Sequence, residues 1–179
     1  MDGLWGNDQA YVEKYLQSPE GYYLTGDAGY IDKDGYVYIM ARTDDVINTA
    51  GHRISTGRIE EVLAEHPFVA ENAVVGKDDS LKGEVPVAFI VIQKEMDHAK
   101  LAKELQSIVR EKVGAFAKLE GIVFVNRLPK TRSGKILRNL MRDISNGIKA
   151  PRITPTIEDR GVVPEIMKAW EDIQAKKSA

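Results

Sequence analysis

A basic stretch near residue 130 has the residue types and spacing of an anion-binding site. The sequence LPKTRSGKILR places Lys130, Arg132 and Lys135 around Gly134, and Lys135 has no acidic residue within six positions on either side. We expect a helix capped by Ser133 here, whose free amides and dipole would attract an anion. The glycine spacing of a Walker A loop is missing. A solvated basic turn would explain each cation singly, so these residues alone leave the function open.

Two further polar stretches contain residue types suited to a nucleotide. In LTGDAG, Asp27 could accept the paired hydroxyls of a ribose, although a turn-capping role is the simpler interpretation of its spacing. In ARTDDVINTAGHR, Arg42 and Arg53 could grip phosphate through their planar guanidinium groups, or form ordinary surface ion pairs. Gly51 would let a ligand approach the backbone. His52 lacks partners at metal-ligand spacing, so we predict no metal site.

The charge of the chain is unevenly distributed. Net charge is −2, but residues 100–149 contain twelve Lys or Arg against four Asp or Glu, a net of +8 that leaves −10 elsewhere. This basic half favours an anionic ligand such as phosphate, and a solvated helical surface explains it equally. Its two aromatic residues, Phe116 and Phe124, show no stacking pattern, so we do not expect nucleic acid as a partner.

Composition excludes several classes of protein. Cysteine is absent from the 179 residues, which rules out disulfides, thiolate catalysis and cysteine-bound zinc. No run approaches the ~18 apolar residues needed to cross a bilayer, so no membrane partner is expected. The start, MDGLWGNDQA, lacks the basic-then-apolar order of a signal peptide.

Periodicity predicts an α+β fold. Asp34-Gly35 between β-prone runs indicates a hairpin. Apolar spacing then predicts three helices, with further strands between them; the helices fall at residues 55–66, 101–114 and 133–147, and the strands at 73–75, 85–92 and 122–125. A further helix is possible at 166–173. The elements form a β-hairpin plus a short mixed sheet flanked by about three helices, with a front end that looks foreign to it.

Three segments together resemble the C-terminal part of acyl-CoA synthetases in the adenylate-forming (AMP-binding) superfamily. They are YYLTGDAGYIDKDGYVYIMARTDDVINTAGHRIST, GRIEEVLAEHPFVAENAVVG and LPKTRSGKILRNLM. VINTAGHRIST and the TIED at 156–159 are most similar to the short-chain acetyl- and propionyl-CoA synthetases, slightly more to the latter. The resemblance implies that residues 1–43 are the tail of a large N-terminal domain, 44–150 a mobile C-terminal domain, and 151–179 an extension.

The resemblance also implies a role for particular residues. Lys135 would be the catalytic lysine of adenylation and a target for acetylation. Asp27 would hold the ribose hydroxyls of ATP, and Arg42 would contact the nucleotide. Asp44 would be the hinge on which the small domain turns between the two half-reactions. For the second half-reaction, the implied contacts are Asn48 and Arg53 with the adenylate, Gly51 with the pantetheine arm of CoA, and Arg110 with the CoA 3′-phosphate.

The function implied is ATP-dependent conversion of acetate or propionate, with CoA, to acyl-CoA, AMP and pyrophosphate. ATP, CoA and Mg²⁺ carried by ATP are the expected cofactors. The expected partners are the enzyme's own N-terminal domain and a lysine acetyltransferase and deacetylase. We expect the fragment to be inactive alone and the enzyme to lie in the cytoplasm or mitochondrial matrix. An adenylation domain that loads a carrier protein, and a non-catalytic nucleotide- or CoA-binding module, are the alternatives.

Overall fold

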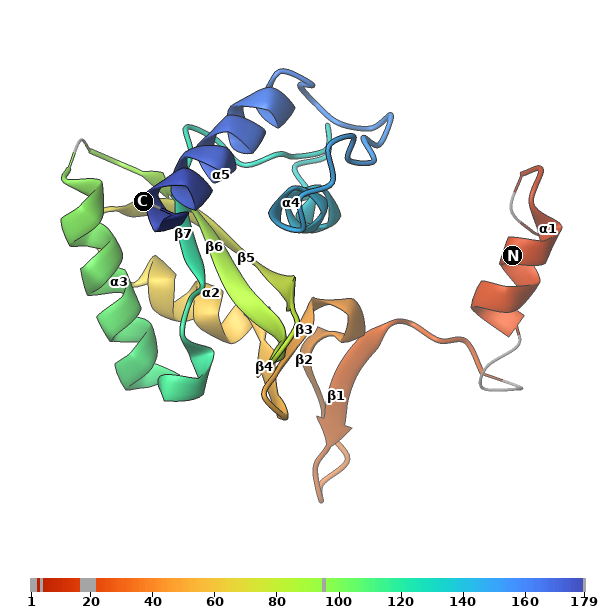
Figure 1. Ribbon diagram of the computed structural model, residues 1–179. Coiled ribbons are helices and arrows are strands. Elements are labelled where there is room, and N and C mark those ends of the chain that lie inside the picture. Colours follow the sequence, from red (N-terminus) through yellow and green to blue (C-terminus); the bar gives the residue numbers. More distant parts are fainter. Residues whose placement is uncertain (1–2, 4, 17–21, 95, 179) are drawn as a thin grey trace. The chain divides into compact units, whose positions relative to one another are not determined.

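The computed structural model describes residues 3, 5–16, 22–94 and 96–178 (Figure 1). The chain divides into two compact units, Met1–Asp44 and Asp45–Ala179. Each unit has its own secondary structure: the first contains a two-stranded sheet, and the second contains a five-stranded sheet.

The first unit is built from a short helical segment and one β-hairpin. Helix α1, Asp8–Tyr11, continues into a π-helical turn at Val12–Leu16, an element that the sequence analysis did not predict. Strands β1, Asp27–Ile31, and β2, Val37–Arg42, pair antiparallel. The hairpin predicted from Asp-Gly is therefore confirmed.

Local chemistry explains why the chain reverses between β1 and β2. One carboxylate oxygen of Asp32 accepts the backbone N–H groups of Asp34 and Tyr36, both at 2.9 Å. Gly35 has φ +87°, a left-handed conformation that glycine adopts without the steric cost of a Cβ atom. Asp32 and Gly35 thus form the turn together.

The second unit is organised around a mixed sheet of five strands. The strand order is β4-β3-β6-β5, and β7 pairs parallel with β6 while the other pairs are antiparallel. Because β5 pairs with β6 over its full length, β3 and β7 must share the other edge of β6. The strands are β3 Val46–Thr49, β4 His52–Ser55, β5 Val69–Asp79, β6 Gly83–Ile92 and β7 Gly121–Phe124.

Helices cover both faces of this sheet (Figure 1). Alternate residues of a strand point to opposite faces, and β5 and β6 are apolar on both. Val74, Ala88 and Ile90 pack with α2, Thr56–Ala64, and α3, His98–Lys112. The next residues along the strands pack with α4, Arg138–Ser145, and α5, Val162–Ser178, and they are Ala73, Val75, Val87 and Phe89. The predicted α+β class is confirmed, with α5 as a further helix.

Pro86 lies inside β6 at a position where its missing N–H costs no pairing. β3 pairs with β6 at Gly83, and β7 begins to pair at Val87, so Pro86 falls between the two neighbours on that edge. Its carbonyl accepts the N–H of Glu120 at 2.7 Å.

One sequence-based expectation differs from the structure. Ser133 does not cap a helix: α4 begins only at Arg138, with Leu137 in the N-cap position. Within residues 151–178, the buried side chains of Ile157, Ile166 and Trp170 belong to the core on the α4 and α5 face. Trp170 packs against Gly121, where a Cβ atom would stand 3.1 Å from the indole.

Candidate functional site

Lys135 lies in a tight hairpin loop before α4. The N–H of Thr131 donates to the carbonyl of Lys135 at 2.8 Å, and the N–H of Lys135 donates to Thr131 Oγ1 at 3.1 Å. Gly134 closes the turn with φ +83° and donates to the carbonyl of Thr131 at 2.8 Å. The backbone of Lys135 is therefore fixed on both sides while its side chain is exposed.

The helix-dipole explanation for an anion at this loop is wrong. Arg138, the first residue of α4, comes three positions after Lys135, and the hydroxyl of Ser133 lies 3.0 Å from Thr131 Oγ1. Turn formation by Thr131 and Gly134 takes the backbone groups that a helix start would need. Positive charge here comes from side chains alone.

The three cations of the loop differ in their surroundings. Lys130 forms an ion pair with Glu71, with Nζ 2.7 Å from the carboxylate oxygen. In the part of the chain that the structure describes, the side chains of Arg132 and Lys135 have no hydrogen-bond or ion-pair partner, and both are exposed. Arg132 is held by its backbone instead, since its N–H donates to the carbonyl of Thr156 at 3.0 Å. A free ammonium on a fixed backbone suits an anionic ligand.

Asp27 and Arg42 come together in the first unit. They are register partners across β1 and β2, and Arg42 Nη1 lies 3.7 Å from Asp27 Oδ1 and 3.3 Å from the carbonyl of Thr25. Gly26 has φ +77°, and a Cβ atom there would stand 3.1 Å from Arg42 Nη2. The TGD glycine thus leaves room for the arginine that faces Asp27.

A second cluster lies on the β3–β4 hairpin. Asn48 pairs with Arg53 across the two strands, and both are exposed. The connecting residues Ala50 and Gly51 have φ +48° and +84°, the left-handed pair that two-residue hairpin turns require. A Cβ atom at Gly51 would have no neighbour within 4 Å. The turn is therefore open to an incoming ligand.

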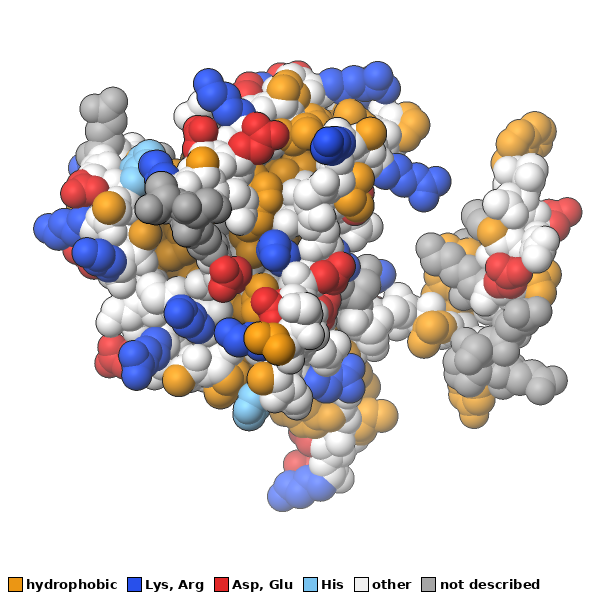
Figure 2. All heavy atoms as spheres, in the orientation of Figure 1, with side chains coloured by type: hydrophobic (Ala, Val, Ile, Leu, Met, Phe, Trp, Pro, Cys, Tyr) orange, Lys and Arg blue, Asp and Glu red, His pale blue; other side chains and the backbone are white. Residues whose placement is uncertain are grey.

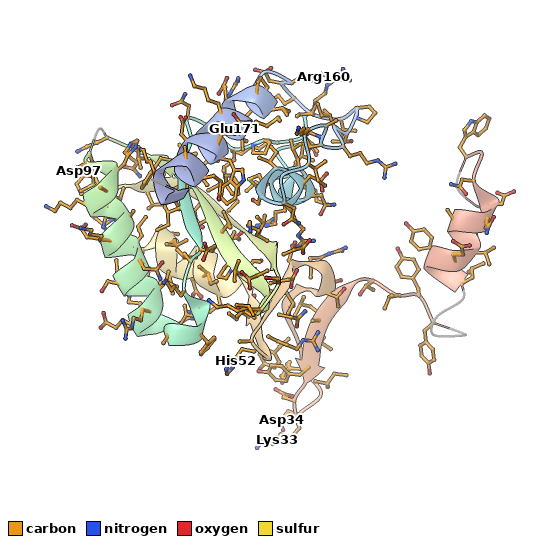
Figure 3. The ribbon with its side chains drawn as sticks, viewed as in Figure 1. Lys33, Asp34, His52, Asp97, Arg160 and Glu171 are labelled. Carbon is orange, nitrogen blue, oxygen red and sulfur yellow. The ribbon has the colours of Figure 1, made fainter. Side chains whose placement is uncertain are left out.

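Arg110 lies near the end of α3 and is exposed. It borders an open pocket of about 500 Å³ on the α3 side of β7, which Lys103 and Glu120 also line. Among the described residues, no hydrogen bond or ion pair joins Arg110 to Gly51. The ring of His52, at the turn (Figure 3), stacks on Phe116, after α3, with centroids 4.7 Å apart.

The hinge candidate lies at the boundary of the two units. Asp44 is the second residue of the 3₁₀ turn Thr43–Asp45, and the units divide after it. Its side chain lies outside the described part of the chain. Thr43 belongs to the first unit, where its N–H donates to the carbonyl of Gly26 at 2.8 Å. Asp45 already contributes to the electrostatics of the second unit.

Sequence analysis did not predict an ion pair between Arg138, three residues after Lys135, and Glu60 of α2. Arg138 donates to both oxygens of Glu60, at 3.0 and 2.8 Å, and Glu60 also accepts the N–H of Val74 at 2.8 Å. Burial disfavours the charge of Arg138, but the hydrogen bond and the attraction of Glu60, together with Asp45, raise the pKa of its guanidinium above the ordinary value. The two residues are 78 positions apart, so no local pattern indicates them.

Within the described ranges, no three His, Asp or Glu side chains converge on a possible metal position.

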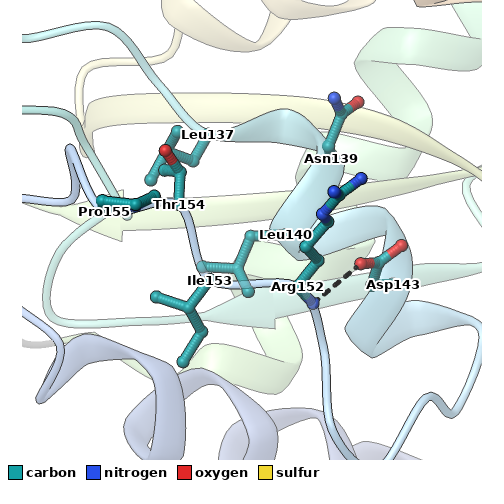
Figure 4. Close-up of a pocket in the computed structure, with 8 residues that line it drawn as sticks. All are labelled: Leu137, Asn139, Leu140, Asp143, Arg152, Ile153, Thr154 and Pro155. Carbon is teal, nitrogen blue, oxygen red and sulfur yellow. Dashed lines mark hydrogen bonds between the residues drawn. The ribbon is translucent and has the colours of Figure 1, made fainter. Parts of the chain in front are cut away.

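An open pocket of about 590 Å³ lies between α4 and residues 152–155 (Figure 4), where the N–H of Arg152 donates to Asp143 at 3.3 Å. On the face shown in Figure 2, Lys and Arg side chains are interspersed with Asp and Glu. No helix among the described residues combines the length and apolar character needed to cross a membrane.

The fold and the loop sequences are those of adenylate-forming enzymes. Residues 58–135 match the family model of the AMP-binding enzyme C-terminal domain. O-Succinylbenzoate-CoA synthetase of Bacillus subtilis, solved with an acyl-adenylate intermediate, superposes with a TM-score of 0.66 at 30% identity, covering 86% of this chain and 29% of that one. The chain therefore belongs to the AMP-binding enzyme family and carries its C-terminal domain, as the resemblance predicted.

Curated relatives define the branch more closely. Mitochondrial acyl-CoA synthetase short-chain family member 3 of Mus musculus is 47% identical over 173 residues, which are 94% of this chain and 25% of the relative. Acetyl-coenzyme A synthetase of Pyrobaculum aerophilum is 42% identical over 177 residues, 98% of this chain and 26% of the relative. The chain thus corresponds to the C-terminal portion of acyl-CoA synthetases and spans about a quarter of their length.

Proposed function

We propose that this chain is the C-terminal part of an ATP-dependent short-chain acyl-CoA synthetase acting on acetate or propionate. The observation that carries the proposal is the exposed ammonium of Lys135, which is unpaired among the described residues on a backbone fixed by Thr131. Relatives named acetyl-coenzyme A synthetase and short-chain acyl-CoA synthetase support the substrate class. The fragment supplies a lysine and a CoA-facing hairpin, and it is inactive alone.

In the first half-reaction, a carboxylate oxygen attacks the α-phosphorus of ATP and the bond to pyrophosphate breaks. Negative charge develops on the reacting phosphoryl group and on the leaving group, and the ammonium of Lys135 would stabilise both. Asp27 would accept the ribose hydroxyls, with Arg42 against the same nucleotide. Mg²⁺ would arrive with ATP, and we assign it no ligand in this chain.

In the second half-reaction, the CoA sulfur attacks the acyl carbonyl carbon and the bond to AMP breaks. The open backbone at Gly51 would admit the pantetheine arm. Asn48 and Arg53 would lie near the adenylate, and Arg110 would meet the 3′-phosphate. Lys135 precedes a helix on the α4 and α5 face, whereas the helix of Arg110 covers the other face. This separation supports a rotation about Asp44 between the two steps.

The first unit supports the idea of a larger N-terminal domain. Among its described residues no apolar side chain is buried, and a two-stranded hairpin alone is at most marginally stable. Six apolar residues of the hairpin are exposed by 44–70%, namely Tyr30, Ile31, Tyr36, Val37, Tyr38 and Ile39. We propose that residues 1–43 complete the sheet of that domain.

We also propose that the complete enzyme lies in the mitochondrial matrix or the cytoplasm, which agrees with its similarity to a mitochondrial relative and to the Pyrobaculum relative.

Exposure also makes Lys135 accessible to a lysine acetyltransferase. Acetylation would remove the positive charge that the first half-reaction needs and would leave the second face unchanged. A deacetylase would restore activity. This regulation rests on the catalytic assignment of the same residue.

Substitution of Lys135 in the complete enzyme tests the proposed function. Pyrophosphate release with acetate, propionate and butyrate is measured for wild type and Lys135→Ala, and thioester formation is measured separately from pre-made acyl-adenylate. We expect Lys135→Ala to lower pyrophosphate release by about 10²- to 10³-fold and to leave thioester formation intact. Lys176→Ala, an exposed lysine of α5, is the matched control and should behave as wild type. Wild-type pyrophosphate release by Lys135→Ala would disprove the assignment.

A further inference from the structure

The β3–β4 hairpin has little backbone pairing to the rest of the sheet. Only one pair of residues, Thr49 and Gly83, joins β3 to β6. Beyond it, the N–H of Ala50 donates to the carbonyl of Lys82 at 2.8 Å. Gly83 has φ +82°, and a Cβ atom there would stand 3.1 Å from the carbonyl oxygen of Asn48. The hairpin therefore depends on side chains to keep its position.

A carboxylate supplies the missing acceptor for β3. Glu84 Oε2 accepts the backbone N–H of Asn48 at 2.8 Å, across 36 residues of sequence. The other oxygen, Oε1, lies over Gly76, where a Cβ atom would stand 3.0 Å from it. Glu84 is half-buried, and among the described residues no cation pairs with it. Its role is thus to accept a hydrogen bond, for which its charge is not required.

The other strand of the hairpin, β4, is held by an aromatic contact with the segment that follows α3. The ring of His52, the first residue of β4, stacks on Phe116, which follows α3. Ile47 of β3 and Ile54 of β4 are buried in the core. Closer to the Ala50–Gly51 turn, Glu84 holds Asn48 of β3 and Phe116 holds His52 of β4. Asn48 and Arg53 extend from the same pair of strands.

We propose that Glu84 is a positioning residue for the thioester half-reaction. The inference rests on the proposed function, because it takes Gly51, Asn48 and Arg53 as the face that receives CoA and the adenylate. Glu84 acts through the amide of Asn48 and does not touch the substrate. It fixes the turn so that the pantetheine arm meets a preformed backbone. Adenylation, which depends on Lys135, does not require it.

Two substitutions in the complete enzyme separate this role from a general structural one. We expect Glu84→Ala to lower kcat/KM for CoA about tenfold, the effect of one lost hydrogen bond of ordinary strength, in thioester formation from pre-made acyl-adenylate. Glu84→Gln should stay within about twofold of wild type, since its amide oxygen still accepts the N–H of Asn48. Pyrophosphate release should be unchanged in both. Glu171→Ala, an exposed glutamate of α5, is the control.

Amide hydrogen exchange of residues 46–52 in the same proteins tests the contact directly. Exchange should be faster in Glu84→Ala and unchanged in Glu84→Gln. The inference is overturned if Glu84→Ala has wild-type kcat/KM or exchange, if Glu84→Gln loses as much as Glu84→Ala, or if pyrophosphate release falls in parallel. In those cases wild type still forms acyl-CoA and the proposed function stands. If wild type forms no acyl-CoA from the adenylate, the proposed function fails and this inference falls with it.

Discussion

Carboxylates in this chain fix turns and strand ends by accepting backbone N–H groups. Asp32, Asp79, Asp97 and Asp159 each accept at least one amide from a residue two to four positions ahead. A hydrogen bond to the charged form of a carboxylate stabilises that form. At Asp79, the amides of Lys82 and Leu81 lower the pKa below 3.8. At Asp159, the amide of Gly161 and then Arg127 do the same.

The Asp79 turn gives a pH-dependent prediction. Because the pKa of Asp79 is lower in the folded chain, its contribution to stability is complete above its ordinary value of 3.8 and is lost as pH falls through the folded value. We expect Asp79→Asn to unfold at a lower temperature than wild type at pH 7, and this difference to shrink below pH 3.8. Thermal unfolding midpoints from pH 7 to pH 3 measure it. Asp172→Asn, on exposed α5 surface, should show no such convergence, and a gap for Asp79→Asn that is equal at all pH values would refute the prediction.

At the scale of elements, one ion pair connects the helices on the two faces of the sheet. β5 is an edge strand, and the N–H of Val74 on that edge donates to Glu60 of α2. Arg138, at the start of α4, grips the same carboxylate with two nitrogens. The pair thus passes around the edge of β5 and satisfies one of its free amides, which protects the edge from pairing with another chain.

Breaking this pair should destabilise the second unit. The side chains of Arg138 and Glu60 are only 26% and 17% exposed, and we expect Arg138→Ala to lower the free energy of unfolding by about 2 kcal/mol because a half-buried carboxylate loses its partner. Glu60→Ala should cost more, since Val74 also loses its acceptor. Urea unfolding of both single variants and the double variant gives the coupling energy. Strictly additive effects would show that the pair contributes nothing as a pair.

Periodicity predicted most elements of the second unit but not the start of α4. The strands at 73–75, 85–92 and 122–125 and the helices at 55–66 and 101–114 were found within a few residues, because their buried faces repeat regularly. In KTRSGK, Ser133 is a residue type that often caps a helix. The turn forms instead because Gly134 adopts a left-handed conformation and Thr131 takes the amide of Lys135. A local competition of this kind is invisible to hydrophobic spacing.

The residues of the candidate site also differ in how far the sequence indicates them. Lys135, Asp27 and Gly51 stand in short motifs whose composition is unusual for packing, and the family resemblance of those motifs assigned each residue its expected role. Glu84 and Glu60 look like ordinary surface acids in the sequence, and their partners lie 36 and 78 residues away. Residues that position a site through long-range contacts have no sequence signal of their own.

At the scale of the whole molecule, the two units differ in their capacity to fold. All buried hydrophobic residues in the described part of the chain lie at position 47 or beyond, and all of them except Val85 belong to the two clusters on the faces of the sheet. Burial of apolar surface is the main favourable contribution to folding. The second unit therefore holds the apolar burial that stabilises the chain.

We therefore expect a chain of residues 45–179 to fold alone, with an unfolding free energy equal to that of the full chain within the extrapolation error of about 10–15%. Residues 1–44 alone should show no cooperative transition. Urea unfolding followed by tryptophan fluorescence reports the second unit, because Trp170 is only 5% exposed; full chain with Trp5→Phe, which removes the other tryptophan, is the matched comparison. If residues 45–179 lost cooperativity, the first unit would have to contribute to the core, and a domain that turns freely about Asp44 would be physically untenable.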